Sequence, residues 1–140
     1  MEKSKKKGSI RGRVKKRISK IQYQKAIKKY WQNTEFDLIL YSTPPMTYNK
    51  VIVGLKKKET KTYLLLKDIF PQNAVDLGMF SPKSFLYKIF RKKEERLYQL
   101  SDYIGCMSPA NVDYVLRHNR EVDARRVEVC PNSIELCKEE

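Results

Sequence analysis

Four polar segments each follow a run of apolar residues, and they hold the side chains best suited to chemistry. They are Ser42–Pro45, Lys67–Asn73, Ser108–Asn111 and Pro131–Ser133. Among them, Asp68 is a carboxylate that can position or deprotonate a hydroxyl group near neutral pH. The alternative for Asp68 is a structural one, in which it accepts a hydrogen bond from a nearby loop amide.

Two further residues in these segments suit the binding of an anion. Lys67 can contact a phosphate as a point charge, and the amides that follow Ser108 open a predicted helix whose N-terminus attracts anions. Each also has an ordinary explanation. A lysine is most often a solvated surface charge, and Ser108 followed by Pro109 is a typical N-cap with proline at the first helical position.

The cysteines and the histidine are not spaced as metal ligands are. The three cysteines, Cys106, Cys130 and Cys137, are separated by 24 and 7 residues, and the single His118 has no cysteine or histidine near it. A structural zinc site needs about four ligands at tighter spacing. We therefore expect no metal and no cofactor, and we interpret the cysteines as reduced thiols, with Cys106 and Cys130 buried.

The positive charge of the chain is concentrated at its N-terminus. The net charge is +14, and residues 1–30 hold 13 Lys or Arg against one acidic residue. Apolar spacing over residues 14–31 predicts a basic amphipathic helix. It would lie on an anionic membrane, bind nucleic-acid phosphates or pack on a sheet. The residues expected to face a membrane are Lys15, Lys16, Ile18, Ile27, Tyr30 and Trp31.

Length and composition limit the class of protein. The 140 residues suffice for one domain, and an apolar fraction of 41% with plentiful aromatic residues argues against a wholly disordered chain. No apolar run approaches the roughly 20 residues that a membrane-spanning helix needs. No apolar stretch of the kind found in a secretory signal follows the basic N-terminus. We therefore expect a cytoplasmic protein.

The candidate residues would be positioned by alternating strands and helices. Apolar patterns predict strands at 36–41, 62–66, 103–107 and 127–130. They predict helices at 14–31, 47–58, 81–101 and 108–118, with a loop at 67–78. This alternation predicts an α/β fold, a partial Rossmann-like parallel sheet with helices on both faces. In such sheets, ligands bind at the carboxyl ends of the strands, where the four polar segments lie. The expected divisions are a basic N-terminus at 1–13, a domain at 14–133 and a tail at 134–140.

Four segments together resemble a known family. They are Phe36–Thr47 (FDLILYSTPPMT), Tyr63–Met79 (YLLLKDIFPQNAVDLGM), Ser101–Val115 (SDYIGCMSPANVDYV) and Val127–Ile134 (VEVCPNSI). In this order they are similar to the N-terminal domain of family 4 retaining glycosyltransferases, most of all to the WbuB-type enzymes of bacterial O-antigen and capsule loci. The resemblance covers about residues 18–140.

The resemblance implies an activity and a location. Such enzymes have two Rossmann-like domains that face each other across a cleft, the GT-B architecture, and they need no metal. The N-terminal domain holds the acceptor, and the C-terminal domain holds a nucleotide-sugar donor. The implied reaction transfers a sugar, an amino sugar in this branch, to a lipid-linked glycan at the inner face of the bacterial plasma membrane.

The resemblance also assigns roles to particular residues. It implies a catalytic role for Asp68, although many members have a histidine where this chain has Lys67. The residues expected to line the acceptor side of the cleft are Ser42, Thr43, Pro44, Lys67, Ser108 and Asn111. The first strands and the donor domain of the family have no counterpart in these 140 residues, so we expect the isolated chain to be inactive. Two alternatives remain, namely a small basic α/β module that binds nucleic acid and a remnant without activity.

Overall fold

The computed structural model describes residues 22, 24–31, 33–43 and 48–132. The chain divides into two compact units, residues 1–34 and residues 35–140. In the first unit, residues 24–31 are helical, which agrees with part of the helix predicted at 14–31. The expected domain boundaries at residues 13 and 134 lie outside the described residues.

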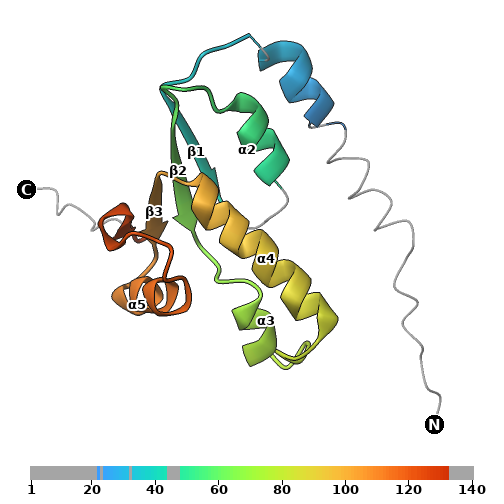
Figure 1. The fold of residues 1–140 in the computed structure, drawn as a ribbon, viewed down its shortest axis with the longest axis vertical. Helices are drawn as coiled ribbons and strands as arrows, with labels where there is room; N and C mark the ends of the chain where they lie inside the picture. The colour runs from blue at the N-terminus through green and yellow to red at the C-terminus, as the bar shows by residue number, and fades with distance from the viewer. Residues whose placement is uncertain (1–21, 23, 32, 44–47, 133–140) are drawn as a thin grey trace, which may run out of the picture. The chain divides into compact units, whose positions relative to one another are not determined.

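The second unit is built on a four-stranded parallel sheet (Figure 1). Its strands are β1 (Leu38–Ser42), β2 (Lys61–Leu66), β3 (Tyr103–Cys106) and β4 (Val127–Val129). They are hydrogen-bonded in the order β1-β2-β3-β4, and each neighbouring pair is parallel. The prediction of an α/β fold with a Rossmann-like parallel sheet is therefore confirmed.

Helices connect the strands. They are α2 (Asn49–Leu55), α3 (Gln72–Asp76), α4 (Phe85–Leu100) and α5 (Pro109–His118), and a short 3-10 helix (Ala124–Arg126) precedes β4. Three of them correspond to predicted helices, whereas α3 lies within the segment predicted as a loop. Residues 72–76 escaped prediction because a helix of barely more than one turn has too few positions to show a periodic apolar pattern.

The start of α4 also differs from the prediction. The sequence Ser81-Pro82 suggested a cap and a first helical residue, but the helix begins at Phe85. Its N-cap is Ser84, whose Oγ accepts a hydrogen bond from the Tyr87 amide at 3.2 Å. Ser81 instead accepts a bond from the Lys83 amide at 3.2 Å, which makes a local turn. Two serines near one proline both suit a cap, and only packing selects between them.

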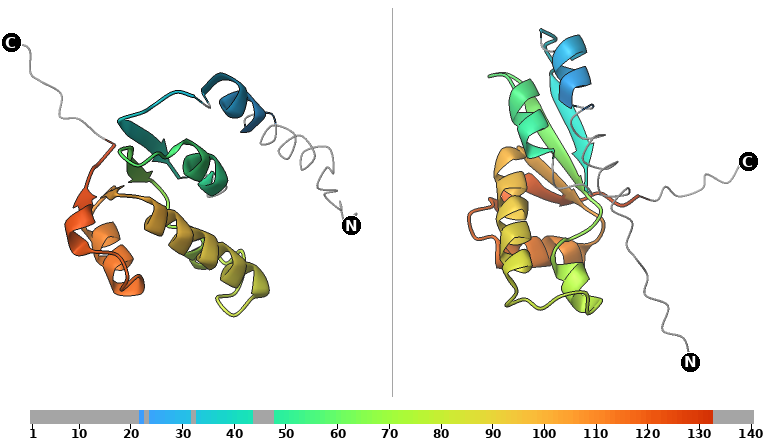
Figure 2. Two further views of the ribbon diagram at one scale, coloured as in Figure 1. Left: turned by 45° about the horizontal axis from the view of Figure 1, so that its top comes forward. Right: turned by 90° about the vertical axis from the view of Figure 1, so that its right-hand side faces the viewer.

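The core lies between the sheet and the helices that connect its strands (Figure 2). It is made of side chains from one face of β2 and β3, from the inner faces of α2, α4 and α5, and from the segment that follows α5. These residues are Ile52, Leu64, Leu66, Leu97, Tyr98, Ile104, Cys106, Val115 and Val122. Burial of Cys106 agrees with its interpretation as a structural thiol, and burial raises its pKa to about 11. The expectation that Cys130 is also buried is wrong, because its side chain, just after β4, is only half-buried.

The opposite face of the sheet carries apolar side chains that are partly exposed. Leu38, Leu40 and Tyr103 are exposed on the face that alternates with the core positions. Consecutive parallel strands in the order β1 to β4, joined by right-handed crossovers, place every connecting helix on the same side.

Candidate functional site

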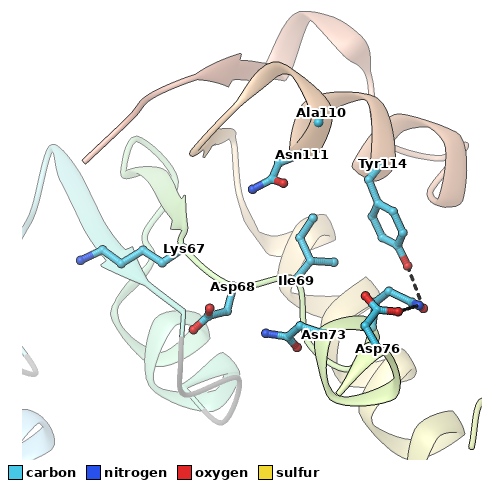
Figure 3. A pocket seen from close by; sticks show the side chains of 9 residues that line it. Lys67, Asp68, Ile69, Asn73, Asp76, Ala110, Asn111 and Tyr114 are labelled. Carbon is cyan, nitrogen blue, oxygen red and sulfur yellow. Dashed lines mark hydrogen bonds between the residues drawn. The ribbon is translucent and has the colours of Figure 1, made fainter. Parts of the chain in front are cut away.

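A pocket of about 420 Å³ opens at the carboxyl ends of β2 and β3 (Figure 3). It lies between α3 and the first turns of α5. The lining residues come from the segment after β2 and from these two helices. They are Lys67, Asp68, Ile69, Gln72, Asn73, Asp76, Ala110, Asn111 and Tyr114. This is the end of a parallel sheet at which ligands bind in α/β folds.

Thr43 fixes the segment that carries Lys67 and Asp68. Its side chain is buried, and its Oγ1 accepts hydrogen bonds from the amides of Lys67 at 3.0 Å and Asp68 at 3.1 Å. The Thr43 amide donates in turn to the Leu65 carbonyl at 3.1 Å. Thr43 therefore does not line the pocket, and it acts as a positioning residue for the two side chains that do.

One wall of the pocket is the face of α3. Gln72, Asn73 and Asp76 are spaced so that they share one side of a helical turn. The Gln72 Nε2 donates to Asp76 Oδ1 at 2.8 Å. Within the described residues, the buried Asn73 Oδ1 has no hydrogen-bond partner. A buried amide oxygen without a partner is unfavourable, so a ligand donor that reached it would remove that penalty.

The opposite wall is the first part of α5. Ser108 is its N-cap, and its Oγ accepts from the Asn111 amide at 3.3 Å, which leaves the Asn111 side chain in the pocket. One turn further along, the Tyr114 hydroxyl donates to Gln72 Oε1 at 3.2 Å and joins the two walls. Burial is the main cause that raises the pKa of Tyr114 to about 12, so its hydroxyl is neutral at physiological pH.

The polar groups of the pocket suit hydroxyl-rich ligands better than phosphates. The lining holds two carboxylates, Asp68 and Asp76, and one lysine, Lys67. The Lys67 side chain extends away from Asn111 and Tyr114 (Figure 3). A phosphate would meet a net negative lining. Hydroxyl groups would find acceptors on the carboxylates and both donors and acceptors on the amides.

The structure gathers only part of the predicted site. Lys67, Asp68 and Asn111 line one pocket, whereas Ser42 ends β1, Ser108 caps α5 and Pro44 lies outside the described residues. Sequence reasoning missed four polar lining residues, Gln72, Asn73, Asp76 and Tyr114, and also the apolar Ile69 and Ala110. The available signal was spacing. The polar pair at 72 and 76 and the pair at 111 and 114 are each one helical turn apart.

The residues predicted to face a membrane are only partly described. Lys15, Lys16 and Ile18 lie outside the described residues. Ile27 is buried, and Tyr30 and Trp31 are exposed. No helix in the described part of the chain is long and apolar enough to cross a bilayer. Those residues also hold no group of three or more metal-ligating side chains.

No protein-family model, curated protein or solved structure matches the chain.

Proposed function

We propose that the chain is the acceptor-side part of a retaining glycosyltransferase that adds a sugar to a lipid-linked glycan. The observation that carries this proposal is the pocket, because it brings Asp68, Asn73, Asp76 and Asn111 together at the carboxyl ends of parallel strands. Carboxylates and amides are the groups that hydrogen-bond sugar hydroxyls. The motif resemblance independently favours the same kind of substrate.

In this proposal, Asp68 is the residue that acts on the acceptor. The Asp68 amide donates a hydrogen bond to Thr43 Oγ1 at 3.1 Å, while the Asp68 side chain remains exposed at the pocket. A carboxylate held there would orient the acceptor hydroxyl and accept its proton. Asn111 and Asn73 would bind neighbouring hydroxyls. The nucleotide-sugar would be bound by a second domain of the kind that the resemblance implies, at the inner face of the bacterial plasma membrane.

Acceptor binding tests the proposal directly. The purified chain is titrated with a detergent-solubilised polyprenyl-diphosphate glycan, and its affinity is measured by calorimetry. We expect Asp68→Asn and Asn111→Ala each to weaken binding about tenfold or more, as the loss of a ligand hydrogen bond to a charged or buried group does. The matched control is Asp113→Asn, because Asp113 is an exposed carboxylate on α5 that pairs with Arg117 at 3.5 Å outside the pocket.

Two results would contradict the proposal. One is the absence of binding to the lipid-linked glycan, and the other is an equal effect of Asp68→Asn and Asp113→Asn. The nucleic-acid alternative is tested in the same titration. Tight, salt-sensitive binding of a short oligonucleotide by the chain that failed to bind glycan would favour it.

A further inference from the structure

Large apolar side chains are exposed together where α3 leads into α4. Leu77 is 76% exposed, Met79 70%, Phe85 77% and Leu86 56%. The end of α3, the connection and the first turn of α4 form one corner of this unit (Figure 1). Exposed apolar residues scattered singly need no explanation, but four within residues 77–86, at one corner of the fold, indicate an interaction surface.

The backbone holds the first two of these side chains in place. At the end of α3, the Met79 amide donates to the Ala74 carbonyl at 2.9 Å, and the Gly78 amide donates to Val75 at 2.8 Å. Gly78 has a φ of +68°, a conformation that glycine adopts without strain. The chain therefore turns sharply between Leu77 and Met79 and leaves both side chains on the outside.

Aromatic packing anchors the corner from beneath. The Phe70 ring meets Phe90 of α4 edge-on, with centroids 4.9 Å apart, and meets Phe80 of the connection at 6.1 Å. Ser84 then caps α4. The corner is thus tied to the helices around it, and its four exposed side chains project from a defined support. Their exposure is not the result of an unanchored loop.

Lysines surround the apolar group. Lys83 precedes α4, and Lys88, Lys92 and Lys93 follow on the helix, all exposed. Phe85, Leu86, Lys92 and Lys93 fall within one broad outward face of α4 at helical spacing. The nearby acidic groups already have partners, since Asp76 accepts from Gln72 at 2.8 Å and Glu95 pairs with Arg91 at 3.6 Å. The corner is therefore both apolar and positively charged.

We propose that the α3–α4 corner, formed by Leu77, Met79, Phe85 and Leu86 with Lys83, Lys88 and Lys92, docks on an anionic lipid bilayer. Apolar side chains enter the interface while lysines bind the headgroups. The exposed sheet face lacks this charge pattern, because Lys61 and Glu128 of opposite sign accompany its apolar side chains. The inference does not depend on the proposed function, and it names a surface distinct from residues 15–31.

Docking at the corner has a consequence for the pocket. Leu77 directly follows Asp76, and α3 supplies three of the residues that line the pocket. A bilayer at the corner would bring lipid headgroups next to the pocket. A substrate with a lipid tail would then reach the pocket without leaving the membrane.

A tryptophan at the corner tests the inference in the full chain. The protein has one tryptophan, so Trp31→Phe combined with Phe85→Trp places a single reporter at the corner. We expect its emission to shift to the blue with phosphatidylcholine–phosphatidylglycerol vesicles and to be quenched by brominated acyl chains. The matched control is Trp31→Phe with Val53→Trp, because Val53 is exposed on α2 away from the corner. Its emission should not be quenched.

Substitutions measure the contribution of each kind of side chain. Lys88→Gln and Lys92→Gln should each weaken vesicle binding about fivefold, from about 1 kcal/mol per basic residue near an anionic surface. Lys50→Gln on α2 is the matched control and should have less effect. Leu77→Ser with Leu86→Ser should lower binding and should also reduce quenching of the reporter at position 85.

Three outcomes would overturn the inference. The first is no quenching of the tryptophan at position 85, and the second is equal quenching of the tryptophans at positions 85 and 53. The third is quenching of Trp31 in the wild type without quenching at position 85, which would assign docking to the N-terminal segment. A folded protein, verified by circular dichroism, is required for each comparison. Failure here leaves glycan binding in detergent unaffected, so this inference and the proposed function can fail separately.

Discussion

A buried ionic network connects α4 to the end of α5. Glu94 is buried, accepts a hydrogen bond from the Tyr98 hydroxyl at 2.7 Å and pairs with Arg91. Arg91 also donates to the His118 carbonyl at 2.7 Å and to Asn119 Oδ1 at 2.6 Å. Because α5 carries Asn111 and Tyr114, this network helps to hold one wall of the pocket.

Removal of the arginine should be strongly destabilising. Arg91→Ala leaves the Glu94 carboxylate buried without its cation, and we expect a loss of about 3 kcal/mol of unfolding free energy at pH 7. Burial already raises the pKa of Glu94. A raised carboxyl pKa means that the folded state binds the proton more tightly. The stabilisation from that proton is therefore present at low pH and is lost as pH rises through the folded pKa.

The raised pKa of Glu94 determines how the stability of Arg91→Ala depends on pH. The penalty of Arg91→Ala should shrink as pH falls toward 4, because Glu94 is then protonated and carries no unpaired charge. Urea denaturation of the wild type and of Arg91→Ala at several pH values measures this difference in unfolding free energy. Glu94→Gln with Arg91→Ala is the control, and it should abolish the pH-dependent part. A penalty that stays constant from pH 7 to pH 4 would contradict this account.

At the scale of the elements, the absence of a side chain at Gly105 lets a tyrosine of β2 cross the exposed face of the sheet. Tyr63 on β2 reaches across Gly105 of β3 to donate to Glu128 on β4 at 2.6 Å. A Cβ at position 105 would lie 2.5 Å from the Tyr63 hydroxyl oxygen and 2.8 Å from the Cβ of Cys130. Such distances require both neighbours to move.

Gly105→Ala should therefore destabilise the protein by about 1–3 kcal/mol, the usual effect of overpacking. Tyr63→Ala in the same background should recover part of the loss, because it removes one of the two clashes. The contact with Cys130 would remain. A double-mutant cycle in urea measures the coupling between positions 63 and 105. Strictly additive effects would show that the tyrosine ring does not occupy the space above the glycine.

The elements that the sequence predicted well are those with strong local patterns. Apolar strands such as Lys61–Leu66 and the helix capped by Ser108 were each placed to within a few residues. The five-residue α3 and the true cap at Ser84 were not predicted, because so short a helix shows no periodic pattern and because Ser81 and Ser84 both suit a cap. The same limit applies to the pocket. Lys67, Asp68 and Asn111 were predicted, but Gln72, Asn73 and Asp76 depend on α3.

At the scale of the whole molecule, charge and core belong to different parts of the chain. Residues 1–34 hold 13 Lys or Arg and one acidic residue, a net +12 of the total of +14. The core cluster consists of residues between Ile52 and Val122, all in the compact unit of residues 35–140. Folding of this unit should therefore not require the basic segment.

Deletion of residues 1–34 tests this separation. We expect residues 35–140 to unfold cooperatively, with a midpoint within a few degrees of the full chain, because hydrophobic burial is the dominant stabilising term and the core is retained. Circular dichroism during heating measures both transitions. A truncated chain with no cooperative transition would show that residues 1–34 supply essential packing. If the transition is retained, the truncated chain is nearly neutral and still contains the α3–α4 corner. Vesicle binding by the corner can then be measured without the charge of the N-terminal segment.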